Sequence, residues 1–244
     1  MERVAEHPVP AGPLAVHWIG IDLPAVEAGT LVRVGAELEN AGAAPWSRLN
    51  ISYHWLDERD NPIVWDGIRT PVAAGPAERI ALELAVRAPI PPGAYRLALD
   101  LVDEHRYWLA ELGNFTPTFA VDVRPRDASA ARAYLPDGIE PAPDWEERVR
   151  AAHGEGYSAV GGSIDDGGGR FRRAPAELEP YAPGGGRKPA FTHPLACPSL
   201  LPPLEPNTEV HGLPAWRPEG DEPWLYDARI ELRLRPRRRL RPPT

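Results

Sequence analysis

Short runs that alternate apolar and polar residues recur along the first half of the chain, and they constrain its fold more than any other feature. The clearest three are TLVRVGAELEN (30–40), RIALELAVR (79–87) and GAYRLALDLVDE (93–104). Strict alternation places successive side chains on opposite faces, which is the pattern of a half-buried β-strand. Further strands are expected at 14–22 and 118–124, and turn-forming segments such as DERDNP (57–62) and APIPPG (88–93) separate the runs. About seven such strands, with no amphipathic helix among them, predict a mainly β fold: an immunoglobulin-like antiparallel β-sandwich over residues 14–124.

The stretch NISYHWLD (50–57) belongs to one of these strands. Ile51, Tyr53 and Trp55 share one face, which is the better candidate for the core. Trp55 is therefore expected at the centre of the sandwich, where a buried tryptophan anchors the packing of both sheets. His54 falls on the opposite face and is expected to be an ordinary surface histidine, because no partner suited to a general base stands at recognisable spacing.

Two tryptophans outside the alternating pattern carry the candidate site. Trp65, Asp66 and Arg69 follow the 57–62 turn, and Trp108 follows His105 in EHRYWLAELG. An exposed tryptophan beside charged groups can stack on the apolar face of a sugar ring while the charges bind hydroxyls. In the alternative, Asp66 and Arg69 only pair with each other and the tryptophans cap the core. These five residues form the tentative ligand-binding set.

The residues LENAGAAPW (38–46) and RAPIPPGAYRLALDLVDEHRYW (87–108) resemble a known immunoglobulin-like pattern. The layout is similar to the four-tryptophan domain of autophagy receptors and to the carbohydrate-binding domain of O-antigen export ATPases. The sequence of residues 52–71 and 100–113 looks closer to a bacterial version of this domain. That version accompanies glycosyltransferases, sugar-modifying methyltransferases and polysaccharide-export proteins. The resemblance covers roughly residues 16–123, and it implies a β-sandwich that serves as an accessory module in bacterial polysaccharide chemistry.

Proline and glycine dominate the second half of the chain. Residues 125–143 are predicted to be a linker and residues 144–235 a small, irregular α+β appendage rich in Pro and Gly. Within it, Asp144 can cap a helix of about ten residues that Gly154 ends, and YSAVGGSI and ARIELRLRPR read as strands. The proline-studded stretch 189–235 is expected to lie as an extended strap over another surface.

Two glycine-rich stretches, GGSIDDGGG (161–169) and PGGGRK (183–188), invite a phosphate-loop interpretation. A phosphate loop needs G-x-x-x-x-G-K-[ST] between a strand and a helix, and the proline after Lys188 does not fit. Both stretches are therefore interpreted as solvated loops.

The acidic doublet Asp165–Asp166 is similar to the pair with which glycosyltransferases hold a metal ion, and AVGGSIDD resembles a segment of family-2 glycosyltransferases. One doublet in a glycine-rich loop is more typical of a solvated loop. Because His153, His193 and His211 lack ligand spacing, no metal and no cofactor is expected.

Charge and cysteine content exclude several classes of protein to which the chain could belong. The net charge of −8 argues against a general nucleic-acid or anionic-membrane binder. No apolar stretch approaches the roughly 18 residues of a membrane span, and the N-terminus lacks the pattern of a signal peptide, so a soluble, cytoplasmic protein is expected. The single Cys197 allows no intrachain disulfide and is expected to be an inert buried thiol. Residues 236–244 are predicted to be a basic disordered tail, which could alternatively meet an acidic partner.

Three functions stay open at this stage. The first is a non-catalytic carbohydrate-binding module whose partner is a bacterial polysaccharide or a glycan-modifying enzyme; it requires Trp65 and Trp108 to be exposed on one face. The second is a protein-interaction adaptor, which requires an exposed apolar patch between Leu200 and Trp224. The third is a partial or degenerate glycosyltransferase, which requires Asp165 and Asp166 to converge with another acid in a pocket.

Overall fold

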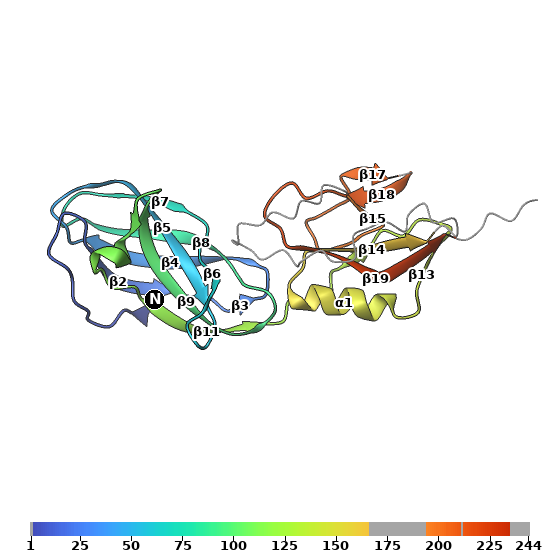
Figure 1. Ribbon diagram of the computed structural model, residues 1–244, viewed down its shortest axis with the longest axis horizontal. Coiled ribbons are helices and arrows are strands. Elements are labelled where there is room, and N and C mark those ends of the chain that lie inside the picture. The colour runs from blue at the N-terminus through green and yellow to red at the C-terminus, as the bar shows by residue number, and fades with distance from the viewer. Residues whose placement is uncertain (1, 166–193, 211, 235–244) are drawn as a thin grey trace, which may run out of the picture. The chain divides into compact units, whose positions relative to one another are not determined.

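The structure of the chain is a computed structural model that describes residues 2–165, 194–210 and 212–234 (Figure 1). It is mainly β, with several sheets and with one α-helix among the described residues. The described residues form two compact units, one of residues 2–125 and one of residues 126–165, 194–210 and 212–234. Asp166, the PGGGRK stretch and the basic tail 236–244 lie outside the described residues.

The first unit contains two sheets. The first has the order β1-β2-β4-β8, and the second has the order β3-β11-β9-β5-β6, with β7 paired to β5 and β10 paired to β9. Pairing is antiparallel throughout except between β3 and β11, which run parallel. The elements are β1 (Glu2–Arg3), β2 (Val16–Asp22), β3 (Val26–Glu27), β4 (Leu31–Asn40), β5 (Trp46–Leu56), β6 (Pro62–Val64), β7 (Thr70–Ala74), β8 (Arg79–Arg87), β9 (Gly93–Asp103), β10 (Tyr107–Trp108), the 3-10 helix η1 (Leu109–Leu112) and β11 (Thr118–Arg124).

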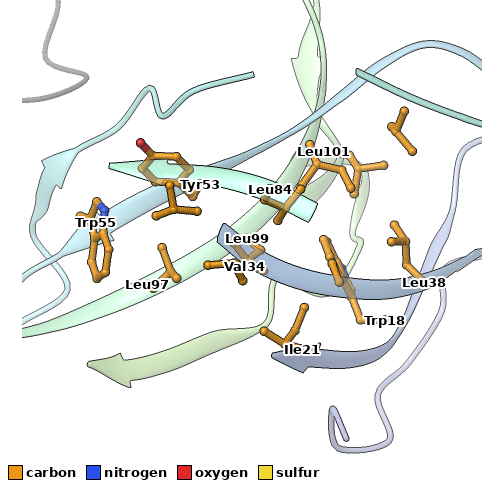
Figure 2. Packing of buried hydrophobic residues seen from close by; sticks show 14 of the residues in the cluster. Trp18, Ile21, Val34, Leu38, Tyr53, Trp55, Leu84, Leu97, Leu99 and Leu101 are labelled. Atoms are coloured by element: carbon orange, nitrogen blue, oxygen red, sulfur yellow. The ribbon is translucent and has the colours of Figure 1, made fainter. Parts of the chain in front are cut away.

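One apolar core joins the two sheets, as expected of a β-sandwich (Figure 2). Trp18 of β2 and Trp55 of β5 enter it from opposite sheets, and both are fully buried. The inward orientation predicted for Ile51, Tyr53 and Trp55 is confirmed, because their exposed fractions are 0%, 1% and 0%. The core tryptophan is also fixed by a polar contact: Trp55 Nε1 donates a hydrogen bond of 2.8 Å to the backbone oxygen of Arg87 on β8.

The opposite face of β5 and β9 is also buried, and here the sequence-based expectation was wrong. His54 is 4% exposed rather than on the surface, and its neighbours Ser52 and Asp100 are each 2% exposed. The reason is that residues 65–69 and 104–112 fold back over this face of the sheet. Alternation identifies which side chains share a face, but it does not show whether later segments cover that face.

The second unit has a five-stranded sheet of order β12-β16-β14-β19-β13 and a three-stranded sheet of order β15-β18-β17. The predicted helix, the strand after it and the last strand are all present. The elements are β12 (Arg132–Ala133), β13 (Ile139–Pro141), α1 (Trp145–Glu155), β14 (Ala159–Asp165), β15 (Leu195–Ala196), β16 (Ser199–Leu200), β17 (Thr208–Val210), β18 (Leu213–Trp216) and β19 (Trp224–Leu234).

The central strands β14 and β19 run parallel and approach very closely at Gly162. A Cβ at this position would lie 1.7 Å from the backbone oxygen of Ile230, so no larger residue fits. The register also shifts between Gly162 and Ile164, which marks a bulge at the close approach.

Two expectations for this half need correction. Residues 132–133 and 139–141, which were placed in a linker, are strands of the five-stranded sheet, and the backbone nitrogen of Arg126 donates to the oxygen of Gly154 at 3.0 Å. The apolar residues of the expected strap, including Leu200, Trp216 and Trp224, are not a covering layer but the core of the second unit. Short strand pairings such as these leave no periodic signal in the sequence.

Candidate functional site

The candidate site is built on the covered face of β5, by the segment that follows the 57–62 turn. After β6, the chain crosses back so that the backbone nitrogen of Gly67 donates to the oxygen of Tyr53 at 3.1 Å. Gly67 is needed at this crossing, because a Cβ there would lie 2.6 Å from both the ring and the backbone oxygen of Tyr53. The close approach sets Trp65 directly above β5 and brings Asp66 and Arg69 to the same surface.

Three aromatic rings form the centre of the site. The ring of Trp65 stacks on the buried His54 ring at a centroid separation of 4.2 Å and an interplanar angle of 25°. Trp108 meets His54 edge-on at 4.4 Å and Trp65 at 6.2 Å. Trp65 is 53% exposed, whereas Trp108 is half-buried. Of the two tryptophans expected to be exposed, only Trp65 is therefore open to solvent. One face of the Trp65 ring is therefore supported from below, which fixes the orientation of an exposed apolar surface.

His54 is the support under this ring, and it is neutral at physiological pH. Burial lowers the pKa of its imidazole, and the hydrogen bond to Trp65 and the charge of Asp66 offset this only in part. Its Nδ1 lies against the backbone oxygen of Trp65. Because a carbonyl oxygen can only accept a hydrogen bond, Nδ1 carries the proton and donates a hydrogen bond to the backbone oxygen of Trp65. The same residue thus fixes both the backbone and the ring of Trp65.

Arg69 connects the aromatic rings to the acidic residues around them. Its Nε donates to Glu104 at 2.7 Å and its Nη2 to Asp66 at 2.9 Å. Its Nη1 donates to the hydroxyl of Ser52 and to the oxygen of Gly67, both at 2.9 Å. The guanidinium carbon also lies 4.9 Å from the centre of the Trp108 ring, a cation–π contact. Partial burial opposes the charge of Arg69, but the two paired carboxylates outweigh it and raise its pKa.

A hollow of about 390 Å³ opens beside Arg69 and Trp108, and Asp66, the neighbour of Trp65 in the chain, also lines it. Its wall combines the Arg69 network with the turn between β9 and β10 and with the start of η1. His105 lines the hollow from that turn, where its φ is +62°, in the left-handed region. The lining residues are Asp66, Arg69, Val102, Glu104, His105, Arg106, Tyr107, Trp108 and Glu111.

The structure brings four of the five sequence-predicted residues together by direct contact, and it places His105 on the same hollow. Sequence reasoning missed the contributions of Ser52, His54, Glu104 and Glu111. A signal for the first two existed, because Ser52 and His54 are polar residues that share one face of a strand. For Glu104 there was none, since only the return of the chain after β9 brings it to Arg69. Glu111 had a local signal, because it stands three residues after Trp108, at the position of a capping box.

Asp100 lies beneath η1 on the same covered face. Its carboxylate accepts hydrogen bonds from the backbone nitrogens of Leu101, at 2.7 Å, and Ala110, at 3.3 Å. Burial nevertheless dominates and raises the pKa of Asp100 to about 7, with a smaller contribution from the charge of Glu111. Asp100 therefore joins β9 to η1, the element that immediately follows Trp108.

The second unit contains a separate hollow of about 700 Å³ between α1, residues 126–133 and β16. Its base holds His153, whose Nε2 lies 2.9 Å from the hydroxyl of Ser199 and whose Nδ1 lies 2.8 Å from the backbone oxygen of Tyr157. The separation would suit a nucleophile and its base. However, both ring nitrogens are bonded within the chain and both residues are fully buried, so the pair is interpreted as a structural link between α1 and β16.

The described residues include neither a metal-binding cluster nor a reactive thiol. No group of three or more His, Cys, Asp or Glu residues in that part of the chain could hold a metal ion. Cys197 is buried, and burial raises the pKa of its thiol to about 11, which keeps it protonated at neutral pH. None of the helices in residues 2–165, 194–210 and 212–234 has the length and apolar character to cross a membrane.

Comparison with models of protein families and with curated proteins finds no match. Among solved structures, the chain is similar to a β-glucuronidase from glycoside hydrolase family 2, with a TM-score of 0.31 and 11% identity. The match covers 61% of this chain and 14% of the β-glucuronidase. A likeness at this level carries no argument about function, which has to come from the site itself.

Proposed function

We propose that the first unit is an immunoglobulin-like carbohydrate-binding module and that the exposed ring of Trp65, together with the neighbouring hollow beside Trp108, is the binding site. The observation that carries this proposal is the most exposed large apolar side chain of the described residues: Trp65 lies open to solvent, yet its orientation is fixed by His54 and Trp108. A flat aromatic surface that is already ordered fits the apolar face of a pyranose ring and loses little conformational entropy on binding.

The polar groups beside Trp65 complete this arrangement. Asp66 and Glu104 are held in place by Arg69, so their carboxylates are positioned to accept hydrogen bonds from the hydroxyls around a stacked ring. A shallow aromatic surface edged by ordered acceptors supports binding rather than chemistry. The adaptor alternative has less support, since Leu200, Trp216 and Trp224, from the segment where it needs an exposed apolar patch, are buried.

The wider role follows from the resemblance of residues 16–123 to the bacterial sandwich. In this proposal the module is a non-catalytic accessory to cell-surface polysaccharide biosynthesis or export. It acts in the cytoplasm and brings a polysaccharide to a glycan-modifying enzyme.

The test is binding of bacterial surface polysaccharides to the full chain, measured by calorimetry. Trp65→Ala should weaken binding about tenfold or more, because an aromatic contact contributes roughly 1.5 kcal/mol. Trp65→Phe, which keeps a flat ring, should retain most of the affinity. Leu31→Ala, which removes another exposed apolar side chain from the other sheet of the same unit, is the matched control and should change nothing. Equal affinity of Trp65→Ala and the unmodified protein would refute the proposed site.

A further inference from the structure

The cations around the hollow are already engaged within the chain. All three nitrogens of the Arg69 guanidinium donate to protein oxygens, on Glu104, Ser52, Gly67 and Asp66. Arg106 donates to Asp103 at 3.0 Å, and its guanidinium carbon lies 5.7 Å from the centre of the Tyr107 ring. To reach Arg69, an anionic ligand would therefore have to displace an existing ion pair. Arg106 is 55% exposed and keeps further donors, but its charge is already balanced by Asp103.

The carboxylates, in contrast, keep capacity to accept. A carboxylate has about four acceptor positions. Asp66 receives one hydrogen bond, from Arg69, and its side chain is 61% exposed. Glu104 receives bonds from Arg69 and Asn50 at a single oxygen, and Glu111 receives one from the backbone nitrogen of Trp108 at 3.3 Å.

The net charge of the hollow leads to the same conclusion as its hydrogen-bonding groups. Three carboxylates line the hollow beside two guanidinium groups, and Asp103 neutralises one of those two. The hollow therefore has a surplus of negative charge and a surplus of acceptors. A ligand that fits it has to bring donors and must not bring further negative charge.

We infer that the Trp65 site selects glycans that are uncharged or carry amino groups, and that it rejects glycans with carboxylate, phosphate or sulfate substituents. Hydroxyl or ammonium groups of the stacked sugar donate to Asp66, Glu104 and Glu111. This inference rests on the proposed function, because the charges only determine which glycan the Trp65 surface accepts.

The experiment compares acidic bacterial polysaccharides with the same polysaccharides after chemical reduction of their carboxyl groups to alcohols. The two members of each pair have the same backbone and differ only where a carboxylate has become an uncharged primary alcohol. Calorimetry with the full chain at pH 7 and low salt should show binding of reduced forms and at least roughly tenfold weaker binding of the native acidic forms. Added salt should narrow that difference, since it screens the repulsion.

A charge variant separates electrostatics from shape. Glu111→Gln keeps an oxygen for the Trp108 nitrogen but removes one negative charge, so it should raise the affinity for the acidic forms roughly threefold relative to the affinity for the reduced forms. Glu83→Gln, an exposed carboxylate on β8 in the other sheet, is the control and should change neither.

The outcomes are distinguishable. Binding of a native acidic polysaccharide as tight as that of its reduced form would overturn the inference and leave the proposed function intact. If no polysaccharide in either form binds, the proposed function fails, and the inference fails with it.

Discussion

Replacing Asp100 by asparagine should change how the stability of the first unit depends on pH. Asp100 is 2% exposed and sits between β9 and η1, where burial raises its pKa from 3.8 to about 7. The folded state therefore keeps the proton over a range of pH in which the unfolded chain has lost it. Asp100→Asn removes the titrating group and keeps nearly the same shape.

The sign and the magnitude follow from this shift. Below pH 3.8 both states are protonated and Asp100 has no effect on the pH dependence. Between 3.8 and about 7 the folded state binds more protons, so the free energy of unfolding falls as pH rises, by about 1.4 kcal/mol per pH unit. The shift of about three units corresponds to a total loss of about 4 kcal/mol by pH 7, beyond which the loss is constant.

The assay is urea unfolding of the full chain at half-unit steps from pH 4 to pH 8. Amide hydrogen exchange of peptides from β5 and β9, followed by mass spectrometry, reports the first unit separately. The amide also leaves one backbone donor without its acceptor, at a cost of about 1 kcal/mol that does not vary with pH.

The burial of Asp100 is therefore tested only by how the difference in the free energy of unfolding changes with pH. The difference between Asp100→Asn and the unmodified protein should grow in favour of the variant from pH 4 to pH 7. Asp122→Asn, on the exposed side of β11, is the control. A difference that stays constant over this range would refute the argument that burial controls Asp100.

Two further predictions concern the second unit. Gly162→Ala should unfold this unit or lower its melting temperature by many degrees in a thermal scan, because the added Cβ would overlap the backbone oxygen of Ile230. An unchanged melting temperature would show that β14 and β19 are not so close. His153 is buried and neutral, and burial lowers its pKa, so the stability of the unit should fall as pH drops below about 6.5, where the unfolded chain takes up the proton. His153→Gln should remove that fall, and an unchanged acid profile would contradict it.

The sandwich was predictable because its strands and turns are determined by residues that are close together in the sequence. Alternation in β5 sets Trp55 and Tyr53 inward and His54 on the opposite face, and turn-formers between the runs mark where strands end. The helix α1 was predictable for the same reason, since Asp144 lies at its start and apolar residues recur on one side of it. The expected end was wrong, because Gly154 lies within the helix, which ends at Glu155 before Gly156. In each case the residues that decide the element are neighbours in the chain.

The second unit and the site depend instead on distant pairings. The two-residue strand β16 pairs with β12 and β14, which are separated from it by dozens of residues, and no periodicity can develop in two residues. Likewise, Arg69 meets Glu104 only because β5 and β9 are adjacent in the sheet and their loops return over the same face. Sequence reasoning found Trp65, Asp66, Arg69 and Trp108 as individual residues, but it had no means of placing Glu104 among them.

The composition of the covered face supports a functional site there. A loop that covered β5 and β9 only for stability would pack apolar side chains beneath it, since buried polar groups cost free energy even when they are hydrogen-bonded. Here Ser52, His54 and Asp100 lie under the cover, while the most exposed large apolar side chain of the described residues, Trp65, lies on top of it. The polar layer is connected to the surface residues, because Ser52 binds Arg69 and His54 binds Trp65. An arrangement that lowers stability in order to fix an exposed aromatic ring is expected where the ring itself is used.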